Sequence, residues 1–340
     1  MKKMDRTRKN LLALGVFMAA FLSVPIFVRQ NYMMSVLTQC FLYASMGVAW
    51  NLIGGYADRV SIGHSAFLAV GAYTSYILYL NLNITPLIGM LVGVVIAGIM
   101  AYLIGKVCLG LRGTFFSLST IAFAEIFKNL LLHFRELTDG SYGLILTYTG
   151  DDPINLQFGS KLPFYFIALV FLGAVLVFNI YFEKSKTGYY LKAIGEDEDA
   201  IRSLGLDTQK VKMRTFIISA MITSMIGTLF GFYLTYIMPT SIASTPVSIK
   251  IIVVAVIGGA GLLWGPVLGA FIIIPLTELV NATLGSLGGA NTMIYGLVLI
   301  LIIIFQPKGV LALFQKGGAV NRIVKKLLVG KSKKGGLANG

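Results

Sequence analysis

Charged side chains are scarce in this chain. Of its 340 residues, 12% are Asp, Glu, Lys or Arg and 56% are hydrophobic, whereas a soluble domain is about 25% charged. The mean hydropathy is correspondingly high, at +0.82. So little charge cannot provide an ordinary water-facing surface. The composition therefore excludes a typical soluble enzyme and places most of the chain in a lipid bilayer.

Cysteine and histidine are almost absent. The two cysteines, Cys40 and Cys108, lie in apolar stretches, so they provide neither a disulfide framework nor a zinc site. The two histidines, His64 and His133, are far apart and have no cysteine or acidic residue at ligand spacing. We therefore expect neither a metal nor another bound cofactor.

Acidic residues are half as numerous as basic ones. There are 14 of them against 28 Lys and Arg, and the formal net charge is +14. Such an excess can indicate nucleic-acid binding. Here the basic residues alternate with segments too apolar for water, so we expect them to face an anionic membrane leaflet and expect no nucleic-acid partner.

Nucleotide-binding and catalytic motifs are also missing. Gly330-Lys331-Ser332 resembles the end of a phosphate-binding loop, but Lys325 stands where its first glycine should be. Gly63-His64-Ser65-Ala66-Phe67 begins like the turn that carries a nucleophilic serine, but it ends on Phe67 instead of glycine. The chain is therefore not expected to be an enzyme. Energy for any work it does must come from a partner or an ion gradient.

Long apolar runs are what the sequence does contain. A run of about 18 residues or more can cross a bilayer as a helix. Ten runs of this kind occur, at 11–28, 33–54, 62–80, 86–109, 114–133, 162–182, 214–237, 247–262, 264–285 and 291–306. No small-residue cleavage site follows the first run, so we expect it to be retained. The predicted fold class is an all-α integral membrane protein with about ten transmembrane helices.

The basic residues divide unequally between the two sides of the membrane. With a cytoplasmic N-terminus, 23 of them fall in inside segments and three, Arg29, Arg135 and Lys161, fall outside. This asymmetry follows the positive-inside rule, so both termini are predicted to be cytoplasmic. The predicted segments are a cytoplasmic tail at 1–10, a transmembrane domain at 11–314 with a main external loop at 135–161 and a cytoplasmic loop at 183–214, and a basic, flexible cytoplasmic tail at 315–340.

Small residues recur at helical spacing in two places. One stripe follows the run at 86–109 and consists of Gly89, Gly93, Ala97, Ala101 and Gly105. It favours the close approach of another helix. The second lies where glycines and Pro266 interrupt the apolar pattern and consists of Gly261, Gly265 and Gly269. We expect a broken backbone there, and these residues either pack against a helix or line a cavity.

Few ionisable residues lie inside the predicted spans. Glu125 and Lys128 are three residues apart, so they can share a helix face and form a pair, and we expect Glu125 to be buried. Glu278 stands alone in the ninth run. Charges at membrane depth are candidates for function, but a paired charge can equally be a packing contact.

The cytoplasmic loop carries signals for two short helices. Residues 188–195 form a helical pattern with Tyr190, Ala193 and Ile194 on one face. An acidic start at 196–199, Arg202 and a terminating Gly205 then mark a second helix. A solvated connector needs neither a cap nor a glycine stop, so we favour a docking element for a partner protein.

Several blocks of the sequence together form a recognisable pattern. The most extensive are GGYADRVSIGHSAFLAVGAY at 54–73 and GGAGLLWGPVLGA at 258–270. Shorter blocks are 111–125, 138–144, 191–206 and 306–309. These blocks resemble the permeases of branched-chain amino acid ABC importers, of the LivM type, and they occur in family order over most of the chain between about 40 and 314.

The resemblance implies a polytopic permease half in the cell inner membrane. Its expected partners are a second, LivH-type permease, two cytoplasmic ATPase subunits, an external substrate-binding protein, the amino-acid substrate and the lipid bilayer. The region 188–206 resembles the segment that couples to the ATPase. The chain departs from the family at Asp58-Arg59, where Gly-Gln is usual, at Thr114, where an acidic residue is usual, and at Gly195, where arginine is usual.

Two groups of candidate site residues follow. The candidates for ATPase coupling are Gly188, Tyr190, Ala193, Ile194, Glu196, Asp197 and Gly205. The candidates for the pathway or for helix packing are Gly63, His64, Gly71, Glu125, Gly261, Gly265, Pro266 and Gly269. No catalytic, cofactor-binding or metal-binding residue is predicted.

Three alternatives remain open. Permeases for urea or another small amide share these blocks and would form the same kind of subunit. An ion-coupled secondary carrier would use Glu125, Lys128 and Glu278 instead of an ATPase. A membrane scaffold or assembly factor would use only the small-residue stripes and would carry no solute.

Overall fold

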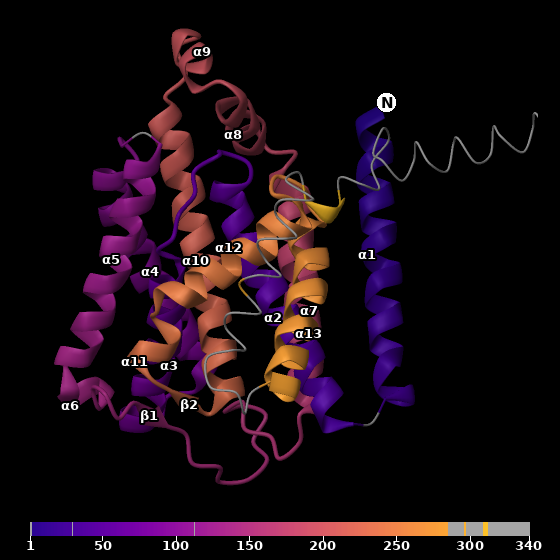
Figure 1. Ribbon diagram of the computed structural model, residues 1–340, viewed down its shortest axis with the longest axis vertical. Coiled ribbons are helices and arrows are strands. Elements are labelled where there is room, and N and C mark those ends of the chain that lie inside the picture. Colours follow the sequence, from indigo (N-terminus) through magenta and orange to yellow (C-terminus); the bar gives the residue numbers. More distant parts are fainter. Residues whose placement is uncertain (1, 29, 112, 285–295, 297–308, 312–340) are drawn as a thin grey trace, which may run out of the picture.

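The computed structural model describes residues 2–28, 30–111, 113–284, 296 and 309–311. These residues form an elongated bundle of long helices joined by short connections (Figure 1). Strands occur in the described part only as β1 (Leu144–Ile145) and β2 (Tyr236–Ile237), which pair antiparallel. The predicted all-α fold class is therefore confirmed.

Nine helices in the described ranges are long and apolar enough to cross a bilayer. They are α1 (Lys2–Phe27), α2 (Asn31–Gly54), α3 (His64–Leu82), α4 (Pro86–Cys108), α5 (Thr114–His133), α7 (Leu162–Phe182), α10 (Thr208–Leu234), α12 (Thr245–Gly259) together with the preceding α11 (Pro239–Ile242), and α13 (Gly265–Leu284). These match the first nine predicted runs. The tenth, at 291–306, and the predicted tail at 315–340 lie outside the described residues, apart from Gly296.

Two boundaries differ from those predicted. α1 begins at Lys2, so residues 2–10 of the predicted tail belong to the first helix. α10 begins at Thr208, six residues before the predicted run, because Asp207 caps it by accepting a hydrogen bond from the Lys210 amide (3.0 Å). The three remaining helices are short: α6 (Arg135–Thr138), α8 (Lys186–Glu196) and α9 (Glu198–Ser203).

α2 forms the centre of the bundle. Every residue from Cys40 to Gly54 is buried, and the helix contacts α7, α10, α12 and α13. Thr38 and Ser45 donate hydrogen bonds to carbonyls of α2 itself, whereas the Trp50 indole donates one to the Ser61 carbonyl of the following loop (2.8 Å). In contrast to the buried α2, α1 contacts chiefly α7 and leaves most of its surface exposed.

Glycines bring α3, α4 and α10 into backbone contact. A Cβ added at Gly71 of α3 would lie 1.8 Å from the carbonyl oxygen of Ser224 in α10. One at Gly227 of α10 would lie 2.0 Å from the carbonyl oxygen of Leu68. On α4, Gly89 and Gly93 face α3 in the same way. The predicted close approach along the α4 stripe is therefore confirmed.

The predicted break in the backbone lies between α12 and α13. α12 ends at Gly259 (φ +126°), Gly261 adopts a φ of +76°, and α13 begins at Gly265. Asn51 of α2 holds this turn, because its side chain accepts a hydrogen bond from the Gly261 amide (2.8 Å) and donates one to the Leu262 carbonyl (3.2 Å).

The glycines that flank this break bring the two helices together. A Cβ at Gly269 would lie 1.8 Å from the carbonyl oxygen of Val254, and one at Gly265 would lie 2.0 Å from that of Gly259. Pro266 packs against Gly47 of α2, where a Cβ would lie 2.9 Å from the proline ring. All three positions therefore make helix–helix contacts.

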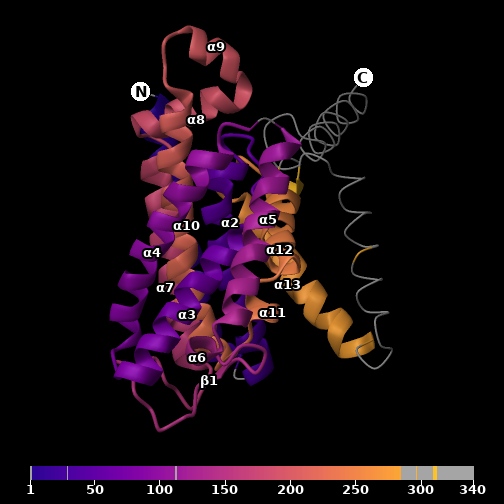
Figure 2. The same cartoon turned by 90° about the vertical axis from the view of Figure 1, so that its left-hand side faces the viewer.

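The two main loops lie at opposite ends of the bundle. The loop at 135–161 contains α6 and β1, and β1 pairs with β2 directly after α10, with Leu144 opposite Ile237. α8 and α9 lie at the other end, where the first residues of α1 are also found (Figures 1 and 2). The arrangement thus separates the segments that the basic residues assign to opposite sides.

Reporter fusions test this assignment of sides. A reporter placed after Glu136, in α6, is expected to be active outside the membrane, and one after Lys192, in α8, to be active in the cytoplasm. The measurement is the activity ratio of alkaline phosphatase to green fluorescent protein at each position. If both positions reported the same side, the orientation derived from the basic residues would be wrong.

Candidate functional site

Two short helices, α8 and α9, form a unit at the predicted cytoplasmic end. α8 begins after Ser185, whose hydroxyl accepts a hydrogen bond from the Gly188 amide (3.1 Å). α9 begins after Asp197, whose carboxylate accepts one from the Ala200 amide (2.9 Å). The chain leaves α9 through Gly205, which has a φ of +82°. The predicted cap and glycine stop of the second helix are therefore confirmed.

The inward face of α8 differs from the predicted one. Ile194 is buried together with Leu191, whereas Tyr190 is 38% exposed and Ala193 is half-buried. The prediction that Tyr190 and Ile194 share one apolar docking face is wrong. Ile194 packs against the protein itself, and Tyr189 and Tyr190 are the aromatic side chains that α8 leaves exposed.

Two glycines decide this orientation. A Cβ at Gly188 would lie 2.2 Å from the carbonyl oxygen of Phe182, and one at Gly195 would lie 2.4 Å from that of Tyr56. Because glycine has no side chain, α8 can press both positions against the bundle, and Leu191 between them turns inwards. Gly195 therefore has a packing role at a position where the resembling family usually has arginine.

A cluster of charges anchors α9. The Glu198 carboxylate forms an ion pair with Arg59 of the α2–α3 loop and accepts hydrogen bonds from Lys212 Nζ (2.6 Å) and Thr208 Oγ1 (2.9 Å) of α10. Arg202 of α9 lies 3.1 Å from the same carboxylate. The Lys212 side chain is only 1% exposed, so Glu198 neutralises a buried cation.

The Glu198 carboxylate of this cluster is ionised at neutral pH. Burial by itself raises the pKa of the Glu198 carboxyl, but the hydrogen bonds from Lys212, Arg59 and Thr208 and the charge of Lys212 outweigh it and lower the pKa to about 2. At neutral pH the charged Glu198 carboxylate therefore links α9 to α10 and to the α2–α3 loop. A displacement of α9 would therefore strain its ion pairs with α10 and with the α2–α3 loop.

A second network anchors α8. Lys192 forms an ion pair with Glu183 (2.9 Å) and lies over the Tyr56 ring, 4.7 Å from its centroid. The Tyr56 hydroxyl lies 2.8 Å from Glu183 and 2.9 Å from Asn179 of α7. α8 is thus tied to the ends of both α2 and α7.

A cleft of about 370 Å³ separates α8 from the turn after α12. Its lining comprises Gly55, Tyr56, Asp58, Lys192, Gly195, Glu196, Ala260, Gly261 and Leu262. Asp58 and Gly195, two of the positions at which the chain departs from the resembling family, thus both line this cleft. The exposed Glu196 also lies on its rim.

The start of α3 joins four helices. His64 is fully buried, with Nε2 2.9 Å from the Ser219 hydroxyl of α10, which in turn donates to the Ala49 carbonyl of α2 (2.6 Å). The Ser65 amide donates to Ser248 of α12 (2.9 Å). Gly63 meets α5, since a Cβ there would lie 2.7 Å from the carbonyl oxygen of Thr120. These residues join helices in the protein interior.

Glu125 is paired but not buried. It forms an ion pair with Lys128, as predicted from their spacing, and it accepts a hydrogen bond from Thr245 at the start of α12 (2.9 Å). The Glu125 side chain is 39% exposed and that of Lys128 is 21% exposed. The expected burial of Glu125 is therefore wrong, because α5 packs against the bundle through its opposite side, with Phe116, Thr120 and Ala124.

Glu278 has a cationic neighbour that sequence reasoning missed. Lys250 of α12 interacts electrostatically with Glu278 of α13, and its Nζ lies 4.5 Å from the centroid of the Tyr43 ring. Glu278 remains the only ionisable residue of the ninth run, as predicted, and its neighbour comes from the preceding run. Lys250 lies inside an apolar run, so the criterion that singled out Glu125 would also have found it.

The sequence profile of one family, described as "Branched-chain amino acid transport system / permease component", matches residues 32–305. The chain belongs to this permease family. It is 28% identical to the high-affinity branched-chain amino acid transport system permease protein LivM of Escherichia coli, over 90% of this chain and 76% of that protein.

Other relatives include both kinds of permease subunit. The chain is 23% identical to LivH of Escherichia coli and 22% identical to BraD of Pseudomonas aeruginosa, in each case over 79% of this chain and 91% of the relative. No solved structure matches the permease. The LivM-type resemblance derived from its sequence blocks is confirmed.

The charge cluster of this permease gives no sequence signal. Arg59 and Glu198 are 139 residues apart. Lys212 follows Glu198 in the chain, but no sequence pattern links the two. Only the packing of α9 between two other elements brings them together. Among the described residues, no three His, Cys, Asp or Glu side chains are close enough to hold a metal ion.

Proposed function

We propose that this permease is one half of the membrane unit of an ATP-driven importer for branched-chain amino acids. Its family and the names of its relatives support this substrate class. The sequence contains no nucleotide-binding motif, which is consistent with a source of energy in another subunit.

The proposed complex contains four further subunits besides this chain. A second permease of the LivH type completes the pathway, two cytoplasmic ATPases drive it, and an external binding protein delivers the substrate. Similarity to both LivM and LivH supports the pairing of two related permeases. The cell inner membrane is the proposed location.

The observation that carries the proposal is the anchored pair of helices, α8 and α9. Two ionic networks hold them to the bundle, while Tyr189, Tyr190 and Leu204 remain exposed, with Leu204 at 77%. Exposed aromatic and aliphatic side chains on a short amphipathic unit suit a groove on a partner protein. We assign this surface to the ATPase, and Asp197 and Gly205 to the helix ends that orient it.

Reconstitution tests the function directly. The permease is co-purified with its proposed partner subunits and placed in vesicles with the binding protein, and uptake of radiolabelled leucine is measured. We expect uptake to require ATP and to survive an ionophore that collapses ion gradients. Uptake that stops with the ionophore but not without ATP would identify an ion-coupled carrier. Uptake of urea in place of leucine would identify the amide importer, and no flux of any solute a scaffold.

Gly205→Val tests the docking surface. A β-branched residue at a φ of +82° is strained by roughly 1 kcal/mol or more, although no atom lies within 4 Å of the added Cβ. We expect normal accumulation in the membrane, loss of ATPase co-purification and a matching loss of uptake. Gly205→Asn is the control, because asparagine tolerates this backbone conformation. Normal ATPase binding and uptake in Gly205→Val would remove the docking role from this segment.

A further inference from the structure

α5 lies at the edge of the bundle and carries an unusual exposed surface. In Figure 1 it borders the bundle on the side opposite α1, and Figure 2 views the molecule from that side. Of its 20 residues only Phe116, Thr120, Ala124 and Leu131 are fully buried. Much of the helix therefore faces something outside this chain.

One side of that exposed surface is polar. Ser117, Glu125, Lys128 and Asn129, with Thr245 of α12 beside them, form what we call the α5 polar stripe. At 1.5 Å per residue, Glu125 lies about 17 Å along the helix, close to the middle of the bilayer. The adjoining side is apolar, with Phe115 67% exposed and Ile126 58% exposed.

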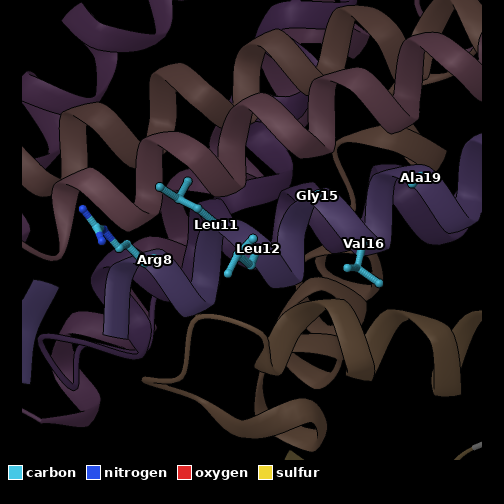
Figure 3. Close-up of a pocket in the computed structure, with 6 residues that line it drawn as sticks. All are labelled: Arg8, Leu11, Leu12, Gly15, Val16 and Ala19. Carbon is cyan, nitrogen blue, oxygen red and sulfur yellow. The ribbon is translucent and has the colours of Figure 1, made fainter. Parts of the chain in front are cut away.

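A charged pair at this depth is incompatible with lipid. Moving a carboxylate or an ammonium group to the centre of a bilayer costs several kcal/mol, so such groups face protein or water. α1 shows what a lipid-facing surface of this protein looks like. Figure 3 shows residues along a hollow of about 560 Å³ on α1, and beyond Arg8 they are all apolar or small: Leu11, Leu12, Gly15, Val16 and Ala19.

Both charges of the pair remain accessible. One carboxylate oxygen of Glu125 contacts Lys128 and the other accepts a hydrogen bond from Thr245, yet the Glu125 side chain is 39% exposed. An amino acid at neutral pH carries an ammonium and a carboxylate a few ångströms apart. A carboxylate and an ammonium held side by side on one helix face are complementary to such a zwitterion.

We propose that the α5 polar stripe lines the water-filled passage between this permease and its LivH-type partner, and that Glu125 and Lys128 contact the ammonium and carboxylate groups of the passing amino acid. This rests on the proposed function, since the passage requires the second permease. The apolar side of α5, with Phe115 and Ile126, faces lipid. One side of α5 therefore faces water and the adjoining side faces lipid.

Thiol accessibility in the assembled transporter tests the proposal. Cys40 and Cys108, both free and buried, are first replaced by alanine. Asn129→Cys represents the polar stripe, and Ile126→Cys is the matched control one turn away on the apolar side. Each variant, co-expressed with the partner subunits, is treated with a charged, membrane-impermeant methanethiosulfonate reagent.

We expect Asn129→Cys to react about tenfold faster than Ile126→Cys or more, because the reactive thiolate forms in water and not in hydrocarbon. Leucine delivered by the binding protein should slow the Asn129→Cys reaction and leave Ile126→Cys unchanged. Equally slow reaction of both positions would place the stripe in lipid and overturn the proposal. Fast reaction of Asn129→Cys without protection by leucine would overturn the contact with substrate.

A second variant separates this proposal from the proposed function. Glu125→Gln is expected to slow leucine uptake at least about tenfold while ATPase co-purification stays normal, because the carboxylate that contacts the zwitterion is lost at a position far from α8 and α9, and the amide oxygen can still accept from Thr245. Glu136→Gln, on the exposed α6, is the control. Full uptake in Glu125→Gln would refute the substrate contact alone. Absence of leucine uptake by the unaltered complex would refute the proposed function, whereas the labelling pattern would still report where the stripe lies.

Discussion

Gly71→Val is expected to prevent this permease from folding. The added side chain would begin 1.8 Å from the carbonyl oxygen of Ser224, a backbone atom in the middle of α10. α3 and α10 would have to separate, which would also break the hydrogen bond from Thr228 Oγ1 to the Gly71 carbonyl (3.0 Å). Overpacking of this kind costs roughly 3 kcal/mol and here acts on the centre of the bundle.

The measurements are the amount of protein in the membrane and the thermal unfolding midpoint in detergent. Gly15→Val is the matched control, because Gly15 lies exposed on α1 with no atom within 4 Å of an added Cβ. We expect this control to accumulate normally. A folded Gly71→Val protein with an unchanged midpoint would mean that α3 and α10 lie further apart than in the structure. Gly71 would then be a candidate for the pathway and not for helix packing.

Glu198→Ala is expected to have the second large effect. It removes the anion that neutralises Lys212, whose side chain is 1% exposed, and it releases Arg59. Breaking one side of a buried ion pair costs about 3–5 kcal/mol, because the remaining charge stays buried without compensation. α9 then loses its tie to α10, so we expect a lower unfolding midpoint and loss of both ATPase co-purification and uptake.

The double variant Glu198→Ala/Lys212→Met separates stability from coupling. Removing the buried charge as well should recover much of the unfolding midpoint. ATPase co-purification should remain weak, because the double variant still lacks the anchor of α9. Glu196→Ala, at an exposed position two residues away, is the stability control. If Glu198→Ala matched that control in every measurement, the charge cluster would have no role in holding α9.

The same cluster predicts a dependence of stability on pH. The pKa of Glu198 is held at about 2, below its ordinary value of 4.5, so ionisation stabilises the folded state above pH 4.5. That contribution is lost as the pH falls from 4.5 towards 2. The unaltered protein should therefore lose stability in this window, and Glu198→Gln should lose less of it. Parallel curves for the two proteins would show that Glu198 titrates normally.

Local features of this permease followed from the sequence because their physical causes are local. Long apolar runs form helices in a bilayer whatever their neighbours are, which explains why nine predicted spans were found. Asp197 caps α9 through a hydrogen bond to an amide three residues ahead, and Glu125 meets Lys128 within one helical turn. No distant part of the chain is needed for any of these.

The tertiary structure decided what depends on how the helices meet. Gly188 and Gly195 press α8 against distant carbonyl groups and so turn Ile194 inwards and Tyr190 outwards, against the prediction from helical spacing alone. The packing of α9 collects Arg59, Glu198 and Lys212 from three elements. The position of α5 at the edge of the bundle leaves Glu125 partly exposed.

Periodicity in a sequence determines which residues share a face of a helix, but the closest backbone contacts determine which face turns towards the protein. In this permease those contacts are made by glycines, whose partners lie on other helices, as Gly71 meets Ser224 and Gly269 meets Val254. A single sequence shows where such glycines are and not what they touch. For that reason the spans, caps and family were readable from the sequence, whereas the charge cluster at α9 and the polar stripe on α5 required the fold.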